Sequence, residues 1–64
     1  MNDDDFDRLE LILNGAQEHE GELTDWERGF VRDTVERVEK YGSRTRVSEK
    51  QWAILDRIYG KLPL

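Results

Sequence analysis

The chain has one histidine, and it lies in an acidic stretch. His19 stands between Glu18 and Glu20, with Glu22 close behind. An imidazole and several carboxylates are ligands that divalent metals accept. A metal site also needs ligands that converge from a rigid scaffold, and we expect this segment to be mobile. The sequence therefore predicts no functional metal site and no cofactor.

Covalent catalysis needs a nucleophile beside a base. Ser43 and Ser48 supply hydroxyls, but the chain has no second histidine to activate them. No glycine-rich phosphate-binding loop is present. Carboxylates are abundant, yet we expect them on exposed helix faces, outside any pocket. The sequence therefore predicts a protein that is not an enzyme.

Basic residues gather in the second half of the chain and raise the possibility of nucleic-acid binding. A helix whose start is basic resembles the recognition helix of a helix-turn-helix unit. The overall pI of about 4.7 opposes such binding. The arginines at positions 44 and 46 are also placed to pair with acids of the same chain. For nucleic-acid binding, the alternative function, the candidate residues are Arg44, Arg46, Lys50, Gln51 and Arg57.

Aromatic residues are numerous for so short a chain, and most of them must fill the core. Three short helices seldom cover two tryptophans completely, and exposed Trp and Tyr side chains are common anchors of protein interfaces. An apolar area left uncovered would suit a protein partner or a homodimer. An acidic segment beside it would suit a basic partner surface. The candidate protein-binding residues are Trp26, Trp52, Tyr59, Asp3, Asp4, Asp5 and Asp7.

Charge is divided unevenly along the 64 residues, whose net charge is −5. Residues 1–23 hold eight acids and one base, a balance of −7, whereas residues 24–64 hold seven acids and nine bases, a balance of +2. A chain this short forms one domain at most. We expect a single domain in which residues 1–23 form an acidic helix or arm and residues 24–62 form a helical hairpin.

Helix-start signals and apolar spacing predict where the elements lie. Thr24 with Glu27, and Ser48 with Gln51, fit the capping box that opens a helix. Apolar residues at three- and four-residue steps predict helices over about 3–14, 25–41 and 49–60. The first helix ends at Asn14-Gly15 or runs on toward Gly21, because its apolar stripe continues to Ala16. The predicted fold is all-α, a compact three-helix domain.

Location and membrane attachment follow from what the chain lacks. No run approaches the roughly 18 apolar residues of a membrane span. The first twenty residues lack the basic start and apolar middle of a signal peptide. The chain has no cysteine, which fits a reducing compartment. We expect a cytoplasmic protein that does not contact a membrane.

Two motifs give the sequence a resemblance. They are LTDWExxFV over residues 23–31 and SEKQWxILxxIY over residues 48–59. The pattern resembles a small helical module of bacteriophage and prophage proteins that sometimes appears beside replication or recombination components. The resemblance implies a phage origin and a bacterial host cytoplasm, and it carries over no functional residue. By analogy with other small acidic phage proteins, we predict a protein-binding module that docks on, and inhibits, a host nucleic-acid-handling or defence complex.

Overall fold

Residues 2–63 are described by the structure, a computed structural model, and they form three α-helices and two short 3₁₀ turns. The α-helices are α1 (Asp3–Glu18), α2 (Asp25–Tyr41) and α3 (Glu49–Lys61). The turn η1 (Glu20–Glu22) links α1 to α2, and η2 (Gly42–Arg44) follows α2. Within residues 2–63 there is no strand, so the predicted all-α three-helix class is confirmed.

The helix starts that the sequence predicts are all present. Thr24 and Ser48 each open a helix with a complete capping box, in which side chain and backbone bond reciprocally. The Asn2 side chain accepts a hydrogen bond of 2.8 Å from the Asp5 N–H and caps α1. At its other end, α2 stops at Gly42, whose φ of +57° favours glycine. The limits of α2 therefore agree with the prediction.

The first helix is longer than 3–14, and of the two predicted ends the structure shows the alternative in which the helix runs on toward Gly21. It continues to Glu18, and the N–H of His19 still donates to the Gly15 carbonyl. Gly15 and Ala16 are both buried. Burial of this last turn outweighs the weak helix preference of Asn14-Gly15, because packing routinely overrides propensity. The third helix also ends one residue later than predicted, at Lys61.

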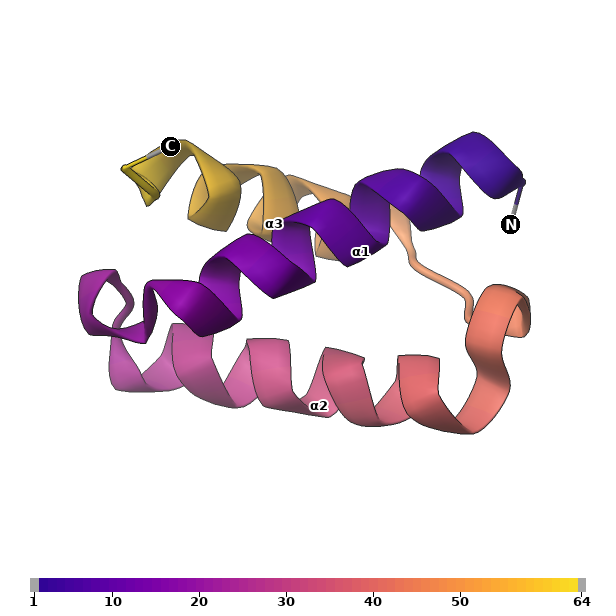
Figure 1. The fold of residues 1–64 in the computed structure, drawn as a ribbon, viewed down its shortest axis with the longest axis horizontal. Coiled ribbons are helices and arrows are strands. Elements are labelled where there is room, and N and C mark those ends of the chain that lie inside the picture. Colours follow the sequence, from indigo (N-terminus) through magenta and orange to yellow (C-terminus); the bar gives the residue numbers. More distant parts are fainter. Residues whose placement is uncertain (1, 64) are drawn as a thin grey trace.

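The core forms around α1, which packs on both α2 and α3 (Figure 1). The helices α2 and α3 approach each other less closely than either approaches α1. The acidic N-terminal segment is therefore part of the core and packs within its own chain. The buried apolar residues are Leu9, Ile12, Leu13 and Ala16 of α1, with Leu23, Val31, Leu55, Ile58 and Leu62.

Arg8, the single base of residues 1–23, ties α1 to α3 on the surface. Its guanidinium forms an ion pair with Asp56. It also lies over the ring of Trp52, 5.1 Å from the ring centroid, a cation–π contact. Asp56 and Trp52 are four residues apart and share one face of α3. The contact orients α1 against α3 at the end where α3 begins.

We expect Leu55→Ala to lower the free energy of unfolding by about 2–5 kcal/mol, because Leu55 is fully buried. A core of this size rarely supplies more than ~3–5 kcal/mol, so much of the variant should be unfolded. Leu11→Ala is the matched control, since Leu11 is 57% exposed. Thermal denaturation followed by circular dichroism makes the comparison. Equal melting of Leu55→Ala and the parent would contradict the position of α3 in the core.

Candidate functional site

The start of α2 is held by a buried carboxylate. Glu27 accepts a hydrogen bond of 2.8 Å from the Thr24 N–H, and the Glu27 N–H donates to the Thr24 hydroxyl at 3.1 Å. The Lys61 ammonium, at the end of α3, lies 2.5 Å from the same Glu27 oxygen. These donors hold the pKa of Glu27 below its ordinary value of 4.5, the hydrogen bond from Lys61 being the largest cause, and they outweigh desolvation.

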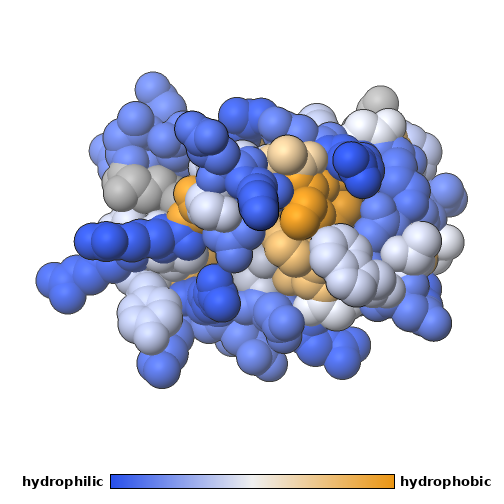
Figure 2. Space-filling view, turned by 180° about the vertical axis from the view of Figure 1, so that it is seen from behind, coloured by the Kyte–Doolittle hydropathy of each residue, from blue (hydrophilic) through white to orange (hydrophobic). Residues whose placement is uncertain are grey.

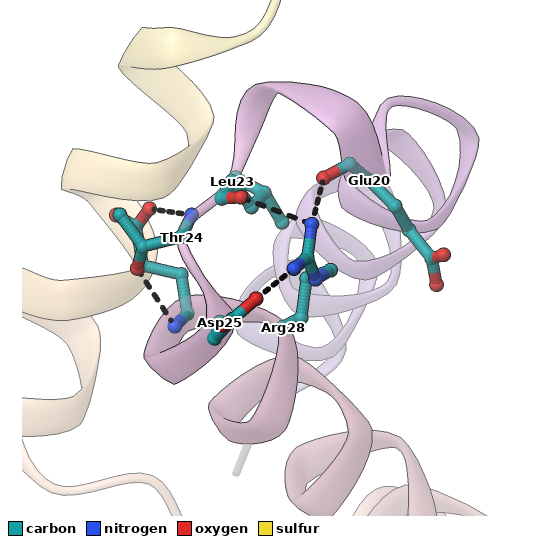
Figure 3. Close-up of polar contacts among 6 residues, drawn as sticks. Glu20, Leu23, Thr24, Asp25 and Arg28 are labelled. Atoms are coloured by element: carbon teal, nitrogen blue, oxygen red, sulfur yellow. Dashed lines mark hydrogen bonds and ion pairs between the residues drawn. The ribbon is translucent and has the colours of Figure 1, made fainter.

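Arg28 bonds to the segment that joins α1 to α2, residues 19–24, which we call the corner (Figure 3). Its guanidinium donates to the carbonyl oxygens of Leu23 at 3.3 Å and of Glu20 at 3.4 Å. It also forms an ion pair with Asp25, three residues earlier on the helix. One side chain thus satisfies two carbonyls of the corner and fixes the direction in which α2 departs. The residue that follows Asp25, Trp26, is therefore presented from a rigid base.

Trp26 is the exposed aromatic side chain at this end of the molecule, with 61% of its surface in contact with solvent. Its ring stacks on Phe30, with centroids 5.6 Å apart and the planes inclined by 20°. Phe30 is half-buried and packs against the core. The two rings, with Gly29 between them, line an open hollow of about 370 Å³ whose remaining walls are Asp25 and Asp33. We call this surface the Trp26 surface.

An apolar area is also visible on the face of the molecule opposite the view of Figure 1. Figure 2 shows apolar side chains that reach the surface there, surrounded mostly by hydrophilic ones. Several apolar side chains of α2 and α3 are only partly covered, among them Phe30 and Ile54. Such an area fits contact with another molecule.

The other predicted anchors are less available. Trp52 and Tyr59 are half-buried and pack against the core, and the ring of Trp52 is also covered by Arg8. Leu11 and Tyr41 are more than half exposed and were absent from the predicted set. Tyr41 directly precedes Gly42, the helix stop, so its place in the last turn of α2 was the signal that could have drawn attention to it.

The predicted acidic residues do not lie beside Trp26. Asp3, Asp4, Asp5 and Asp7 belong to the first two turns of α1. Figure 1 shows that α1 begins at the end of the molecule where α2 stops. The two helices run in opposite directions, so the acids of α1 and the start of α2 are separated along the 29 Å axis. The carboxylates that do line the Trp26 surface are Asp25 and Asp33.

The predicted nucleic-acid residues are brought together only in part. Arg44 and Arg46 lie together with Arg37 and Tyr41 in a second hollow, of about 420 Å³. Gln51 is half-buried and uses its side-chain oxygen to accept from the Ser48 N–H, so it is occupied by the helix cap. Lys50 and Arg57 are exposed on α3 and do not line that hollow. The structure thus gathers Arg44 and Arg46 in one hollow and places Lys50 and Arg57 elsewhere, on α3.

The acidic stretch around His19 does not assemble into a metal site. Between residues 2 and 63, no three His, Asp or Glu side chains come together in a way that could hold a metal ion. In that same range no helix combines the length and the apolar character that a bilayer crossing requires.

Comparison with known proteins gives no relative. No protein-family model, curated protein or solved structure matches the chain. The resemblance to a phage module therefore stays a prediction, and the function has to be argued from the residues themselves.

The lowered pKa of Glu27 predicts a pH dependence of stability. Its carboxylate stabilises the fold fully above pH 4.5, the ordinary value, and this contribution is lost as the pH falls through the lowered pKa. Glu27→Gln keeps an oxygen for the capping box but removes the charge. At neutral pH we expect it to cost about 1 kcal/mol, a figure reduced for the partly exposed Lys61.

The measurement is the free energy of unfolding by urea at neutral pH and at several values below pH 4.5. The difference between the parent and Glu27→Gln should shrink as the pH falls. Glu36→Gln is the control, because Glu36 is exposed on the same helix and forms no ion pair within residues 2–63. A difference for Glu27→Gln that stays constant with pH would show that its charge does not stabilise the fold.

Proposed function

We propose that this chain is a protein-docking module that binds a basic protein partner through the Trp26 surface. The observation that carries the proposal is the exposure of Trp26, 61% of whose surface is open although Phe30 supports its ring. A rigid, supported and exposed tryptophan is the kind of residue that dominates binding energy in protein interfaces. Its backbone is held by the Glu27 and Arg28 contacts, so little order has to be gained on binding.

Gly29 supports the proposal independently. A glycine inside a helix costs about 1 kcal/mol relative to alanine. A Cβ at position 29 would meet no atom within 4 Å, so no close contact inside the chain requires a glycine there. Gly29 instead lines the hollow together with Trp26 and Phe30. A partner group inserted into this hollow would contact the backbone of Gly29 directly and would be displaced by a methyl group.

Charge favours a basic partner. Asp25 and Asp33 line the hollow, and Glu20 and Glu22 are exposed in the corner before α2. The chain as a whole carries a net charge of −5. The partner surface that matches this arrangement is an apolar slot bordered by lysine or arginine. The opposite charges of the two surfaces would speed association. Surfaces of that kind hold nucleic acid in nucleic-acid-handling and defence complexes, and occupying one would inhibit it.

The test places a photo-crosslinking residue at position 26 and, as a control, at the equally exposed position 11. Each protein is incubated with nuclease-treated lysate of a candidate bacterial host. We expect a host protein with a basic surface to crosslink at position 26 and not at position 11. The purified partner is then titrated by calorimetry. Trp26→Ala should weaken binding at least tenfold, whereas Leu11→Ala should leave it unchanged.

Gly29→Ala separates binding from stability. We expect it to raise the free energy of unfolding by up to about 1 kcal/mol and to weaken the same partner several-fold. Gly60→Ala is the matched control, because Gly60 also lies in a helix and a Cβ there would likewise meet no atom within 4 Å. It should leave binding unchanged.

Three results would overturn the docking proposal. The first is crosslinking at position 26 that does not exceed that at position 11. The second is crosslinking at position 26 to a second copy of this chain, which would make the surface a dimer interface. The third is a Gly29→Ala variant that binds the partner as tightly as the parent does.

A further inference from the structure

A second surface lies at the other end of α2 and has a different character. Arg37 and Tyr41 are four residues apart and therefore share one face of the last turns of α2. Arg44 and Arg46 come from η2 and the segment after it. Together with Thr45, these four side chains line the open hollow of about 420 Å³. We call it the arginine hollow. Along the helix, Tyr41 lies roughly 22 Å from Trp26, so the two surfaces are separate.

Thr45 holds this hollow together. It is buried, with 2% of its surface exposed. Its hydroxyl lies 2.7 Å from the carbonyl oxygen of Gly42 and 3.3 Å from that of Arg37, and its N–H also donates to Gly42. The segment after α2 is thereby bonded back onto the helix end. Its neighbours Arg44 and Arg46 are consequently fixed beside Arg37 although they lie outside any α-helix.

The arginines of the hollow have no ion-pair partner among residues 2–63. Within that range, each of the three ion pairs uses a base elsewhere in the chain, namely Arg8, Arg28 or Lys61. The sequence left open whether Arg44 and Arg46 pair with acids of the same chain, and the described residues contain no such pair. Arg37, Arg44 and Arg46 therefore leave three positive charges together at this end of α2 without a paired carboxylate among residues 2–63.

We propose that the arginine hollow binds single-stranded nucleic acid. Each guanidinium offers a planar fork of donors that matches phosphate oxygens. Tyr41, 51% exposed at the edge of the hollow, supplies an aromatic face on which a base can stack. Lys40, whose ammonium lies 5.2 Å from the centroid of the Tyr41 ring, adds a further positive charge. Positive groups beside an exposed ring are the combination by which proteins bind single strands without reading their sequence.

The surroundings limit both the length and the form of the ligand. Asp33 and Glu36 lie on the α2 face that continues from Arg37 and Tyr41, so repulsion of phosphate restricts the strand to a few nucleotides. A duplex keeps its bases stacked within the helix and cannot use the Tyr41 ring. The side-chain oxygen of Gln51, which a bidentate contact with a base edge would need, is occupied by its cap. Single strands are therefore favoured over duplexes.

The experiment measures fluorescence anisotropy of a labelled ten-nucleotide oligothymidylate, and of the matching oligouridylate, titrated with the full chain at several salt concentrations. We expect the logarithm of the binding constant to fall with the logarithm of salt concentration with a slope of about −2, from roughly three phosphate contacts. A duplex of the same length should bind at least tenfold more weakly. Inorganic phosphate, added as a competitor at constant ionic strength, shows whether the free anion alone can displace the oligonucleotide.

Variants assign the binding to the hollow. Arg44→Ala combined with Arg46→Ala should weaken oligonucleotide binding at least tenfold. The control is Arg32→Ala, which removes one charge from an exposed arginine outside the hollow. It should change binding less than twofold, whereas Arg44→Ala alone should weaken binding several-fold. Tyr41→Ala should weaken binding several-fold, and Tyr41→Phe, which keeps the ring, should restore it. Circular dichroism of each variant checks that the helices persist.

Four outcomes would overturn the proposal. They are the absence of binding at low salt, equal losses in Arg44→Ala and Arg32→Ala, equal affinity for the duplex, and full displacement of the oligonucleotide by inorganic phosphate equimolar to the oligonucleotide. An acidic peptide that binds the hollow while the oligonucleotides do not would also count against it. Because the Trp26 surface is not involved, Trp26→Ala should bind the oligonucleotides as the parent does, so this result does not depend on the docking proposal.

Discussion

The carboxylate of Glu27 is the interaction on which the arrangement of the helices depends. It accepts from the Thr24 N–H, which starts α2, and from the Lys61 ammonium, which ends α3. Lys61 is distant in sequence from Thr24 and Glu27, and the buried Glu27 carboxylate joins the start of α2 to the end of α3. A buried carboxylate is costly unless it is paired and hydrogen-bonded, and both conditions are met here. No buried side-chain nitrogen or oxygen in the described residues lacks a partner. The corner is therefore rigid, and the exposed Trp26 next to it inherits that rigidity.

The first helix, α1, both carries negative charge and supplies part of the core. Its outer face carries most of the negative charge of the N-terminal segment, and its inner face supplies four of the buried core residues, Leu9, Ile12, Leu13 and Ala16. Because α2 and α3 pack on α1 more than on each other, the fold cannot keep its core without it. Removing the acidic segment would thus remove the core as well as the charge.

The helix α2 keeps two different surfaces apart. One end presents stacked aromatic rings bordered by carboxylates, and the other presents arginines beside a tyrosine. A helix is stiff over this length, so neither surface can fold onto the other. The acidic start of α1 lies at the arginine end (Figure 1), yet forms no ion pair with Arg44 or Arg46 within residues 2–63. This separation allows a protein partner and a nucleic acid to be considered as independent ligands.

Sequence alone determined the features that depend on near neighbours. The two capping boxes, the stop at Gly42 and the apolar stripe of each helix involve residues within about four positions of one another. The capping boxes and the stop are found as predicted, whereas the two ends of the α2 stripe, Trp26 and Tyr41, are exposed. The exposed position of Leu11 follows from the same periodicity. Local chemistry also suggested Trp26 as an anchor, although not that it would be the most exposed of the three predicted aromatic residues.

Only the tertiary structure decided what lies beside what. The sequence left two ends open for α1, and burial of Gly15 and Ala16 against the rest of the core decided for the longer helix, because packing energy is not visible in local propensity. The antiparallel course of α1 and α2 placed Asp3 to Asp7 far from Trp26. The bonds of Thr45 gathered Arg37 with Arg44 and Arg46. Each of these outcomes depends on packing or hydrogen bonds that reach beyond one helical turn, and spacing and composition cannot supply them.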